Sequence, residues 1–152
     1  DPRSDEALAA MQAYFAELDE RFVGGFDAGD TLTADAPAMR PPSGSFVVAV
    51  AGGDTIACGG IVRVDDETAE IKRMWVHADW RGVGLGRRML ARLEGEVATL
   101  GYRQVVLDTN EVLIEAVAMY ERAGYRPIER YNDNPYAHHW FAKPLGPSLA
   151  AE

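Results

Sequence analysis

The apolar positions near the start of the chain predict an amphipathic helix. Ser4 is followed by two acidic residues, a pattern typical of a helix N-terminus, because a hydroxyl caps the first turn and acids complement the helix dipole. Apolar side chains then recur at helical spacing, at Leu8, Met11, Phe15, Leu18 and Phe22. Gly24 and Gly25 predict where this helix ends.

Three β-rich runs follow a polar loop. The loop covers residues 26–44 and is expected to hold one short helical turn near Ala36. Runs of alternating and β-branched apolar residues predict strands at 45–51, 55–64 and 69–77. Because the turns between these strands are short, the three runs indicate an antiparallel meander.

The second half of the chain alternates between helices and strands. A helical pattern reaches about Leu100, and later patterns predict a strand at 104–109, a helix at 112–124, and strands at 125–130 and 138–145. The order α, short α, β-β-β, α, β, α, β-β predicts a mixed α/β fold with a mostly antiparallel central sheet flanked by helices. With 152 residues the chain has the size of one domain, so we expect a single domain over residues 1–152.

Charge and composition narrow the class of partner. The chain has a net charge of −9, but its arginine and lysine side chains are concentrated at residues 71–103, which favours an anion-binding surface there. The overall acidity argues against nucleic acid as a partner of this domain. No apolar run approaches the roughly 18 residues of a membrane span. Cys58, the single cysteine, lies in an apolar run and is expected to be buried filler in a reducing compartment, so we expect a cytoplasmic protein.

The segment WRGVGLGRRML, residues 80–90, begins a helix with the residue type that least favours one. A glycine costs a helix about 1 kcal/mol relative to alanine, so these glycines predict a ligand that needs bare backbone N–H groups. A nucleoside-triphosphate loop is excluded because the chain has no Gly-Lys-Ser or Gly-Lys-Thr. The dinucleotide fingerprint G-x-G-x-x-G fits Gly82 and Gly84 but fails at Arg87, and its preceding strand belongs to a meander.

A third phosphate-binding pattern, R-x-x-G-x-G, is met by Arg81, Gly84 and Gly86. With the strand AEIKRMWVH before it and the segment MYERAGYRPI after it, nearly the whole chain resembles the GNAT acyltransferase superfamily, whose pyrophosphate signature is [QR]-x-x-G-x-[GA]. The resemblance implies an enzyme that uses acetyl-CoA and transfers the acetyl group directly from the thioester to a primary amine. The chain also resembles the catalytic halves of bacterial proteins that fuse a winged-helix regulator to a GNAT domain, which would explain why it does not begin with methionine.

The resemblance also implies which residues hold the coenzyme. Amides of the glycine loop would wrap the diphosphate, and Met74 and Val76 would pair with the pantetheine arm as an added strand. The expected coenzyme-binding residues are Met74, Trp75, Val76, Arg81, Gly82, Val83, Gly84, Leu85, Gly86, Arg87 and Asn110. Leu113 stands where the family often has an asparagine that touches the coenzyme, so Asn110 either substitutes for it or caps the following helix. No metal is expected.

Two residues are expected to carry the chemistry. Tyr120 aligns with the family's tyrosine near the coenzyme sulfur and is the expected general acid, since a phenol of pKa about 10 is protonated at neutral pH. The alternative is that its ring only packs on the sheet. Glu70 occupies a position where some members have a catalytic glutamate, and it is the expected base, directly or through water. In other members an acid there faces solvent or the acceptor. A backbone N–H at Met74 or Trp75, beside a strand bulge, would polarise the thioester carbonyl.

The identity of the amine acceptor is the part of the function that the sequence determines least, because proteins of one fold act on different substrates. By family analogy, the end of the first helix and the loop YNDNPY at 131–136 flank the acceptor cleft. The expected acceptor-binding residues are Tyr14, Arg21, Phe26, Tyr131, Asn134, Tyr136 and His138. Strand alternation turns one of His138 and His139 inward, and it keeps the two from acting as a metal pair. Arg21 either holds an acceptor carboxylate with two hydrogen bonds or pairs with Glu17 one turn earlier.

Two classes of function remain open at the level of sequence. The first is an N-acetyltransferase acting on a small amine, amino-acid-like or otherwise, or on a protein amine, as a monomer or homodimer. The second is a non-catalytic acyl-CoA-binding module, a sensor or regulatory domain that keeps the loop without turnover. Tyr120 favours the enzyme, whereas Leu113 and the unsettled base leave room for the module.

Overall fold

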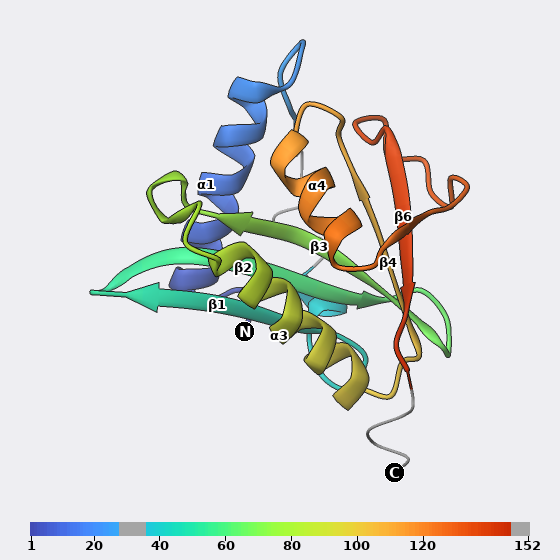
Figure 1. The fold of residues 1–152 in the computed structure, drawn as a ribbon. Helices are drawn as coiled ribbons and strands as arrows, with labels where there is room; N and C mark the ends of the chain where they lie inside the picture. The colour runs from blue at the N-terminus through green and yellow to red at the C-terminus, as the bar shows by residue number, and fades with distance from the viewer. Residues whose placement is uncertain (28–35, 147–152) are drawn as a thin grey trace.

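The computed structural model describes residues 1–27 and 36–146, so part of the loop expected at 26–44 and the last six residues lie outside the described chain. The described residues form a sheet flanked by helices (Figure 1). In chain order the elements are α1 (Asp5–Arg21), η1 (Ala36–Met39), β1 (Ser45–Ala51), β2 (Asp54–Arg63), β3 (Thr68–Val76), η2 (Ala78–Trp80), α3 (Leu85–Thr99), β4 (Gln104–Thr109), α4 (Ile114–Arg122), β5 (Arg126–Pro127) and β6 (His139–Pro144). This order confirms the predicted fold class, except that the short helix near Ala36 is a 3₁₀ turn rather than an α-helix.

The sheet has six strands in the order β1-β2-β3-β4-β6-β5. Every neighbouring pair is antiparallel except β3 and β4, which run parallel. The parallel pair is the one whose connection contains α3, because parallel strands need a long crossover. The mostly antiparallel sheet was therefore predicted correctly.

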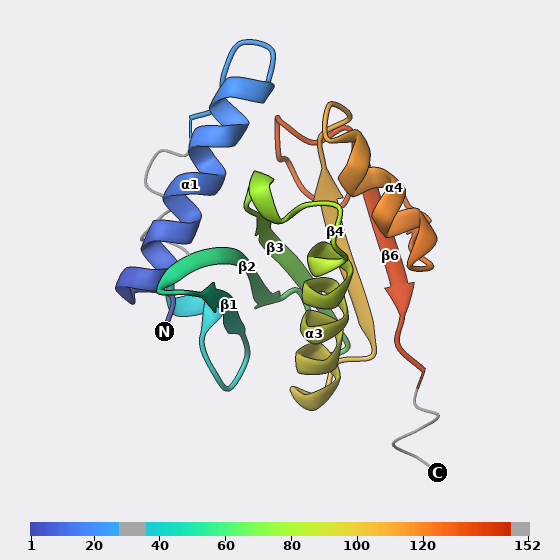
Figure 2. The same cartoon turned by 60° about the vertical axis from the view of Figure 1, so that its left-hand side comes forward.

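Helices cover both faces of this sheet. In Figure 2, α1 lies on one side of the strands, and α3 and α4 lie on the other. The larger core joins α3 and α4 to β2, β3, β4 and β6, through buried side chains such as Leu90, Leu93 and Leu107. A smaller core lies under α1, around Met11 and Met39. No helix within residues 1–27 and 36–146 is long and apolar enough to cross a membrane.

Local chemistry explains most element boundaries. The Ser4 hydroxyl accepts a hydrogen bond from the Ala7 amide at 3.2 Å, so the predicted cap of α1 is confirmed. The helix ends at Arg21, and Gly24 and Gly25 follow with φ of +84° and +81°, backbone conformations that glycine adopts without strain.

The later elements are shorter than predicted. Strand β5 covers two residues instead of 125–130, although the Ile128 amide just beyond it still donates to the Trp140 carbonyl of β6 at 2.8 Å. Helix α4 begins at Ile114 rather than at 112. The Val112 amide instead donates to the side chain of Asn110 at 2.9 Å, a local turn that competes with helix.

Two irregularities of β3 prepare the site. Its ladder with β4 covers only Thr68–Glu70 against Gln104–Val106, although β3 continues along β2 as far as Val76, so β3 and β4 separate beyond Glu70 (Figure 1). The register against β2 also shifts between Cys58 and Gly60, and Arg73 opposite has φ of +57°. The expected bulge is therefore present, just before Met74 and Trp75.

Candidate active site

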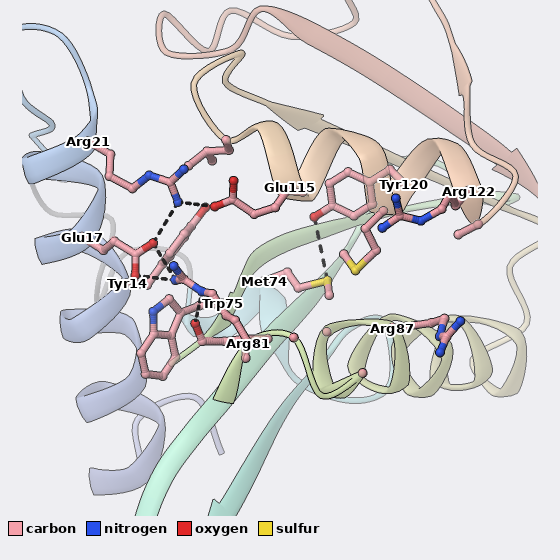
Figure 3. Close-up of a pocket in the computed structure, with 18 of the residues that line it drawn as sticks. Tyr14, Glu17, Arg21, Met74, Trp75, Arg81, Arg87, Glu115, Tyr120 and Arg122 are labelled. Atoms are coloured by element: carbon pink, nitrogen blue, oxygen red, sulfur yellow. Dashed lines mark hydrogen bonds and ion pairs between the residues drawn. The ribbon is translucent and has the colours of Figure 1, made fainter. Parts of the chain in front are cut away.

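A cavity of about 470 Å³ lies where β3 leaves β4 (Figure 3). Its walls come from α1, the end of β3, the loop before α3, and α4. Eleven of the predicted site residues line it: Tyr14, Arg21, Met74, Trp75, Val76, Arg81, Gly82, Gly84, Gly86, Arg87 and Tyr120. Each of the three predicted groups, coenzyme-binding, catalytic and acceptor-binding, therefore contributes residues to one cavity.

The glycine loop presents bare backbone at one end of this cavity. Gly82 and Gly84 have φ of +83° and +84°, and Gly84 is the N-cap of α3 with no side-chain cap. The first amides of α3 consequently have no side-chain acceptor at the cap position. A Cβ on Gly86 would lie 3.2 Å from the Met119 sulfur and 3.7 Å from Val76, so glycine also keeps the gap between β3 and α4 open.

Two arginines border the same end. Arg87 and Arg122 line the cavity from α3 and α4 and carry exposed guanidinium groups. Within the part of the chain that the structure describes, neither makes an ion pair. Free guanidinium groups, a helix N-terminus and a loop without Cβ atoms together form a site that fits a diphosphate. The residues present therefore fit the phosphate end of acetyl-CoA.

Tyr120 occupies the middle of the cavity. Its side chain is 7% exposed, and its hydroxyl donates to the Met74 sulfur at 3.8 Å, from α4 across to β3 (Figure 3). Burial raises the pKa of Tyr120, and the nearby negative charge of Asp108 raises it further. The hydroxyl therefore keeps its proton at neutral pH and can donate it to a group bound against Met74.

The other end of the cavity is closed by a chain of four charges. Glu17 on α1 accepts two hydrogen bonds from the Arg81 guanidinium, at 2.5 and 2.6 Å, and one from Arg21 at 3.3 Å. Arg21 also donates to Glu115 of α4 at 2.6 Å and to the Val112 carbonyl at 3.1 Å. The pairing of Arg21 with Glu17, one of the two roles expected for it, is confirmed. Because the Arg21 guanidinium already donates to these partners, it has no free pair of N–H groups with which to bind an acceptor carboxylate, the other role expected for it.

Glu70, the expected base, lies outside the cavity wall. Its side chain is 9% exposed, and one oxygen accepts hydrogen bonds from the Tyr131 hydroxyl at 2.6 Å and from Asn132 at 3.4 Å. Burial raises the pKa of Glu70, and the Tyr131 hydrogen bond opposes this shift in part. Burial and the adjacent Glu70 carboxylate likewise raise the pKa of Tyr131.

The loop at 131–136 covers this carboxylate with amide side chains. Asn132 and Asn134 donate to the two oxygens of Asp108 at 2.6 and 3.1 Å, and Trp140 donates to Asn132 at 3.0 Å. Asn132 therefore bridges the acids of β3 and β4. Tyr131 and Asn134 hold these acids in place rather than line the cavity.

The remaining acceptor-binding predictions join α1 to the same loop. Phe26 packs against Phe15 and Tyr136, with ring centroids 5.4 and 4.7 Å apart, and the Tyr136 hydroxyl accepts from the Asp27 amide at 3.0 Å. The His138 ring nitrogen Nδ1 accepts from the Glu111 amide at 3.2 Å. The two segments expected to flank the cleft are thus in contact, although these three side chains are not in the cavity wall.

Three predicted coenzyme residues also lie outside the cavity wall. Val83 is 68% exposed in the loop, and Leu85 packs against the main core from the first position of α3. Asn110 is buried and donates to the Tyr136 carbonyl at 2.7 Å while its oxygen accepts from Val112. Its side chain stabilises the turn before α4 rather than the first turn of the helix itself, whose N-cap is Leu113.

The structure adds cavity residues that the sequence interpretation passed over. Besides Leu113, these are Glu17, Leu18, Glu115, Ala116, Met119, Arg122 and Ala123. Glu115, Met119 and Arg122 lie on one side of α4 with Tyr120 beside them, so helical periodicity from Tyr120 could have located them. Cys58 is fully buried as expected, with a pKa raised to about 12 by burial. Among the described residues, no group of His, Cys, Asp and Glu is arranged to hold a metal ion.

Comparisons with known proteins agree with this geometry. The sequence profile of the Acetyltransferase (GNAT) family matches residues 11–125. The chain is 32% identical over 132 residues to IAA acetyltransferase of Azospirillum brasilense, covering 83% of this chain and 85% of that protein.

Solved structures show the same fold. A GNAT-family acetyltransferase of Staphylococcus aureus Mu50 superposes with a TM-score of 0.83 at 16% identity, over 94% of this chain and 96% of that one. A GNAT-family acetyltransferase of Elizabethkingia anophelis with acetyl-CoA bound superposes with a TM-score of 0.62 at 19% identity, over 78% and 85% of the two chains. The chain described here is a member of the GNAT family of acetyltransferases.

Proposed function

We propose that this protein is an acetyl-CoA-dependent N-acetyltransferase that transfers the acetyl group directly from the thioester to a primary amine. The observation that carries the proposal is the Tyr120 hydroxyl, which points at Met74 in the same cavity as the uncapped start of α3. A binding module needs the loop but has no use for a protonated hydroxyl at the end of the strand. The bound coenzyme would supply the activated acetyl group.

The chain's own residues would divide the binding work. The first amides of α3, with Arg87 and Arg122, would hold the phosphates at the helix N-terminus. The separated edge of β3 beyond Glu70 leaves backbone groups of Met74 and Val76 free of β4, so an extended arm can pair with them as a strand does. The backbone N–H beside the bulge would stabilise the negative charge that develops on the thioester oxygen.

Proton movements follow from the two pKa shifts. Tyr120 keeps its proton because burial raises its pKa, and it would donate a hydrogen bond to the departing thiolate. Glu70 would take the proton of the acceptor's ammonium through water, since its carboxylate lies beneath Tyr131 rather than in the cavity wall. Its raised pKa makes it a stronger base than an exposed glutamate.

The cavity limits the size of the acceptor but does not identify it. The relative from Azospirillum brasilense is named an IAA acetyltransferase, whereas a relative from Danio rerio is named an N-acetylaspartate synthetase and a structural neighbour from Sinorhizobium meliloti a phosphinothricin acetyltransferase. A small amine that reaches Met74 past Glu17 fits the cavity of about 470 Å³. We further infer that this domain works in a reducing compartment such as the cytoplasm, because its one cysteine is a free, buried thiol.

Thiol release from acetyl-CoA across a panel of primary amines tests the proposal. We expect release that depends on both the coenzyme and a subset of the amines, with the acetylated amine formed in equal amount. Binding of acetyl-CoA without release for any amine would instead favour the non-catalytic module. Absence of binding would overturn both functions.

A further inference from the structure

Trp75 lines the cavity, and its buried indole N–H has no hydrogen-bond partner among the described residues. The side chain is 6% exposed, and within residues 1–27 and 36–146 its Nε1 is the one buried side-chain nitrogen or oxygen without a hydrogen-bond partner. A buried donor left unpaired is costly, and native structures rarely keep one without a reason. A ligand atom that accepts this hydrogen bond would supply the reason.

Tyr14 on α1 places a second donor against the same wall. It lines the cavity and packs on the buried cluster formed by Ala10, Cys58 and Trp75. Within the described chain its hydroxyl makes no hydrogen bond. Burial raises the pKa of Tyr14, and Tyr120 and Asp108 raise it further, so the hydroxyl stays protonated and can donate. Tyr14 and Trp75 therefore each bring a donor without an acceptor to the region where α1 packs on β3.

The Trp75 donor lies on the other face of β3 from Met74, the residue that the Tyr120 hydroxyl contacts. Met74 packs with the core under α3 and α4, whereas the next residue, Trp75, packs under α1, as alternation along a strand requires. Figure 3 shows Tyr14 and Trp75 beside α1, across the cavity from Tyr120. The coenzyme is expected on the side of Met74 and Val76. The side of Trp75 is therefore left for the acceptor.

We propose that Trp75 Nε1 and the Tyr14 hydroxyl form an oxygen-binding subsite for the acceptor. The inference rests on the proposed function and deepens it. The acceptor is an amine that also carries a carboxylate or carbonyl oxygen. Trp75 and Tyr14 both line the cavity that holds Met74 and Tyr120, so one small acceptor can present its oxygen and its amine to the two sides of this cavity.

The charged residues of the cavity do not fill this role. Arg21 and Arg81 would be the usual carboxylate ligands, but their guanidinium groups hold Glu17 and Glu115. Neutral N–H and O–H groups can donate to a carboxylate oxygen or to an amide carbonyl oxygen. A free amino acid and the N-terminal residue of a peptide therefore share the required chemistry. Because Nε1 is sealed from water by its neighbours, the oxygen reaches it by displacing a side-chain contact rather than a water molecule.

Proton–nitrogen NMR of the indole groups tests the hydrogen bond directly. The chain has three tryptophans: Trp75 has an unpaired Nε1, Trp140 donates to Asn132 at 3.0 Å, and Trp80 is 40% exposed. Spectra are recorded with coenzyme A present, which blocks turnover, and Trp75→Phe assigns the resonance. The probes are α-amino acids, their primary amides, and the amines that lack the carbonyl group.

We expect the Trp75 indole proton alone to move downfield, with amino acids or their amides and not with the matched amines. A response to amino acids alone identifies a carboxylate, and an equal response to amides identifies a carbonyl. An unmoved Trp75 resonance, or an equal shift with the amines, would overturn the proposal.

Kinetics supply an independent readout with a matched control. Trp75→Phe keeps a ring and removes the donor, so kcat/KM for oxygen-bearing acceptors should fall about tenfold and lose its preference over the plain amines. Trp140→Phe removes a donor that already has an internal partner, and it should keep the preference. Coenzyme affinity, measured by calorimetry, should be unchanged in Trp140→Phe. Retention of the preference in Trp75→Phe contradicts the subsite, whereas failure of the wild type to bind acetyl-CoA or acetylate any amine contradicts the proposed function itself.

Discussion

The two ends of the cavity differ in how their polar groups are used. At the coenzyme end, the start of α3 has no side-chain cap, and Arg87 and Arg122 make no ion pair within the described chain. At the acceptor end, Glu17, Arg21, Arg81 and Glu115 are linked to one another by hydrogen bonds. The first end has hydrogen-bond donors that are free to bind an anion. At the second end, the charges of the two arginines and the two glutamates neutralise one another.

This difference matches a distinction between the coenzyme, which related enzymes share, and the acceptor, which differs from one enzyme to another. A diphosphate has fixed charge and size, so the same bare amides serve any protein that binds it. The paired charges join α1, the loop before α3 and α4, and neutral groups such as Tyr14 and Trp75 line the cavity beside them. If the acceptor binds there as we propose, its contacts can change without disturbing the start of α3.

The largest expected effect concerns Tyr120, which lies where the two ends meet. Tyr120→Phe keeps the ring and removes the donor, so kcat should fall on the order of 10–100-fold, about 1.4 to 2.7 kcal/mol, with little change in either Michaelis constant. Steady-state kinetics with both substrates varied measures this.

Tyr125→Phe is the matched control for that experiment. Its hydroxyl donates to Glu94 at 2.8 Å outside the cavity, and its ring lies 5.7 Å from that of Tyr120. This variant should keep the wild-type kcat. Full turnover in Tyr120→Phe would assign the ring to packing alone.

A smaller effect is expected for Glu70. Glu70→Gln should lower kcat about tenfold at neutral pH and leave acetyl-CoA affinity unchanged, and the loss should shrink as pH rises because the free amine then forms without help. The pH–rate profile of the variant, with Glu94→Gln as the control, checks this. A wild-type profile would remove Glu70 from the reaction.

The same substitution has a predicted sign on stability. Because burial raises the pKa of Glu70 in the folded state, its ionisation destabilises the fold at every pH above the ordinary glutamate range. Glu70→Gln should therefore raise the free energy of unfolding near pH 7 relative to the wild type, and this gain should disappear as pH falls below that range. Urea denaturation at several pH values measures it, and a gain that grows on acidification would contradict the burial of the charge.

The smallest effects are expected for two arginine variants, one at each end of the cavity. Arg122→Gln should weaken acetyl-CoA binding a few-fold with no change in stability, because its guanidinium is unpaired. Arg21→Gln should lower the free energy of unfolding by about 1 kcal/mol, since three hydrogen bonds are lost, and leave coenzyme affinity unchanged. Calorimetric and urea titrations of both variants measure the two quantities, and exchanged outcomes would reverse the assignment of the ends.

The sequence predicted local features better than long-range ones. The cap at Ser4, the start of a helix at the glycine loop and the position of Tyr120 on a helix depend on neighbours in the chain, and these local features were predicted correctly. The burial of Glu70 depends on Tyr131, 61 residues away, and the contact of Arg21 with Glu115 spans 94 residues. Such contacts follow from the folded arrangement of α1, α4 and the late loop, which no local pattern encodes.

The central claim, that the glycine loop holds the coenzyme, is tested most directly by titrating Gly84→Val and Gly101→Val with acetyl-CoA. Both glycines have positive φ, +84° and +98°, so valine strains the backbone at both positions, while a Cβ at Gly101 meets no atom within 4 Å. Only Gly84 lies at the start of α3 in the cavity wall. We predict a dissociation constant raised more than tenfold, about 1.4 kcal/mol, in Gly84→Val and an unchanged one in Gly101→Val. Equal dissociation constants in a folded Gly84→Val protein and the wild type would contradict the claim.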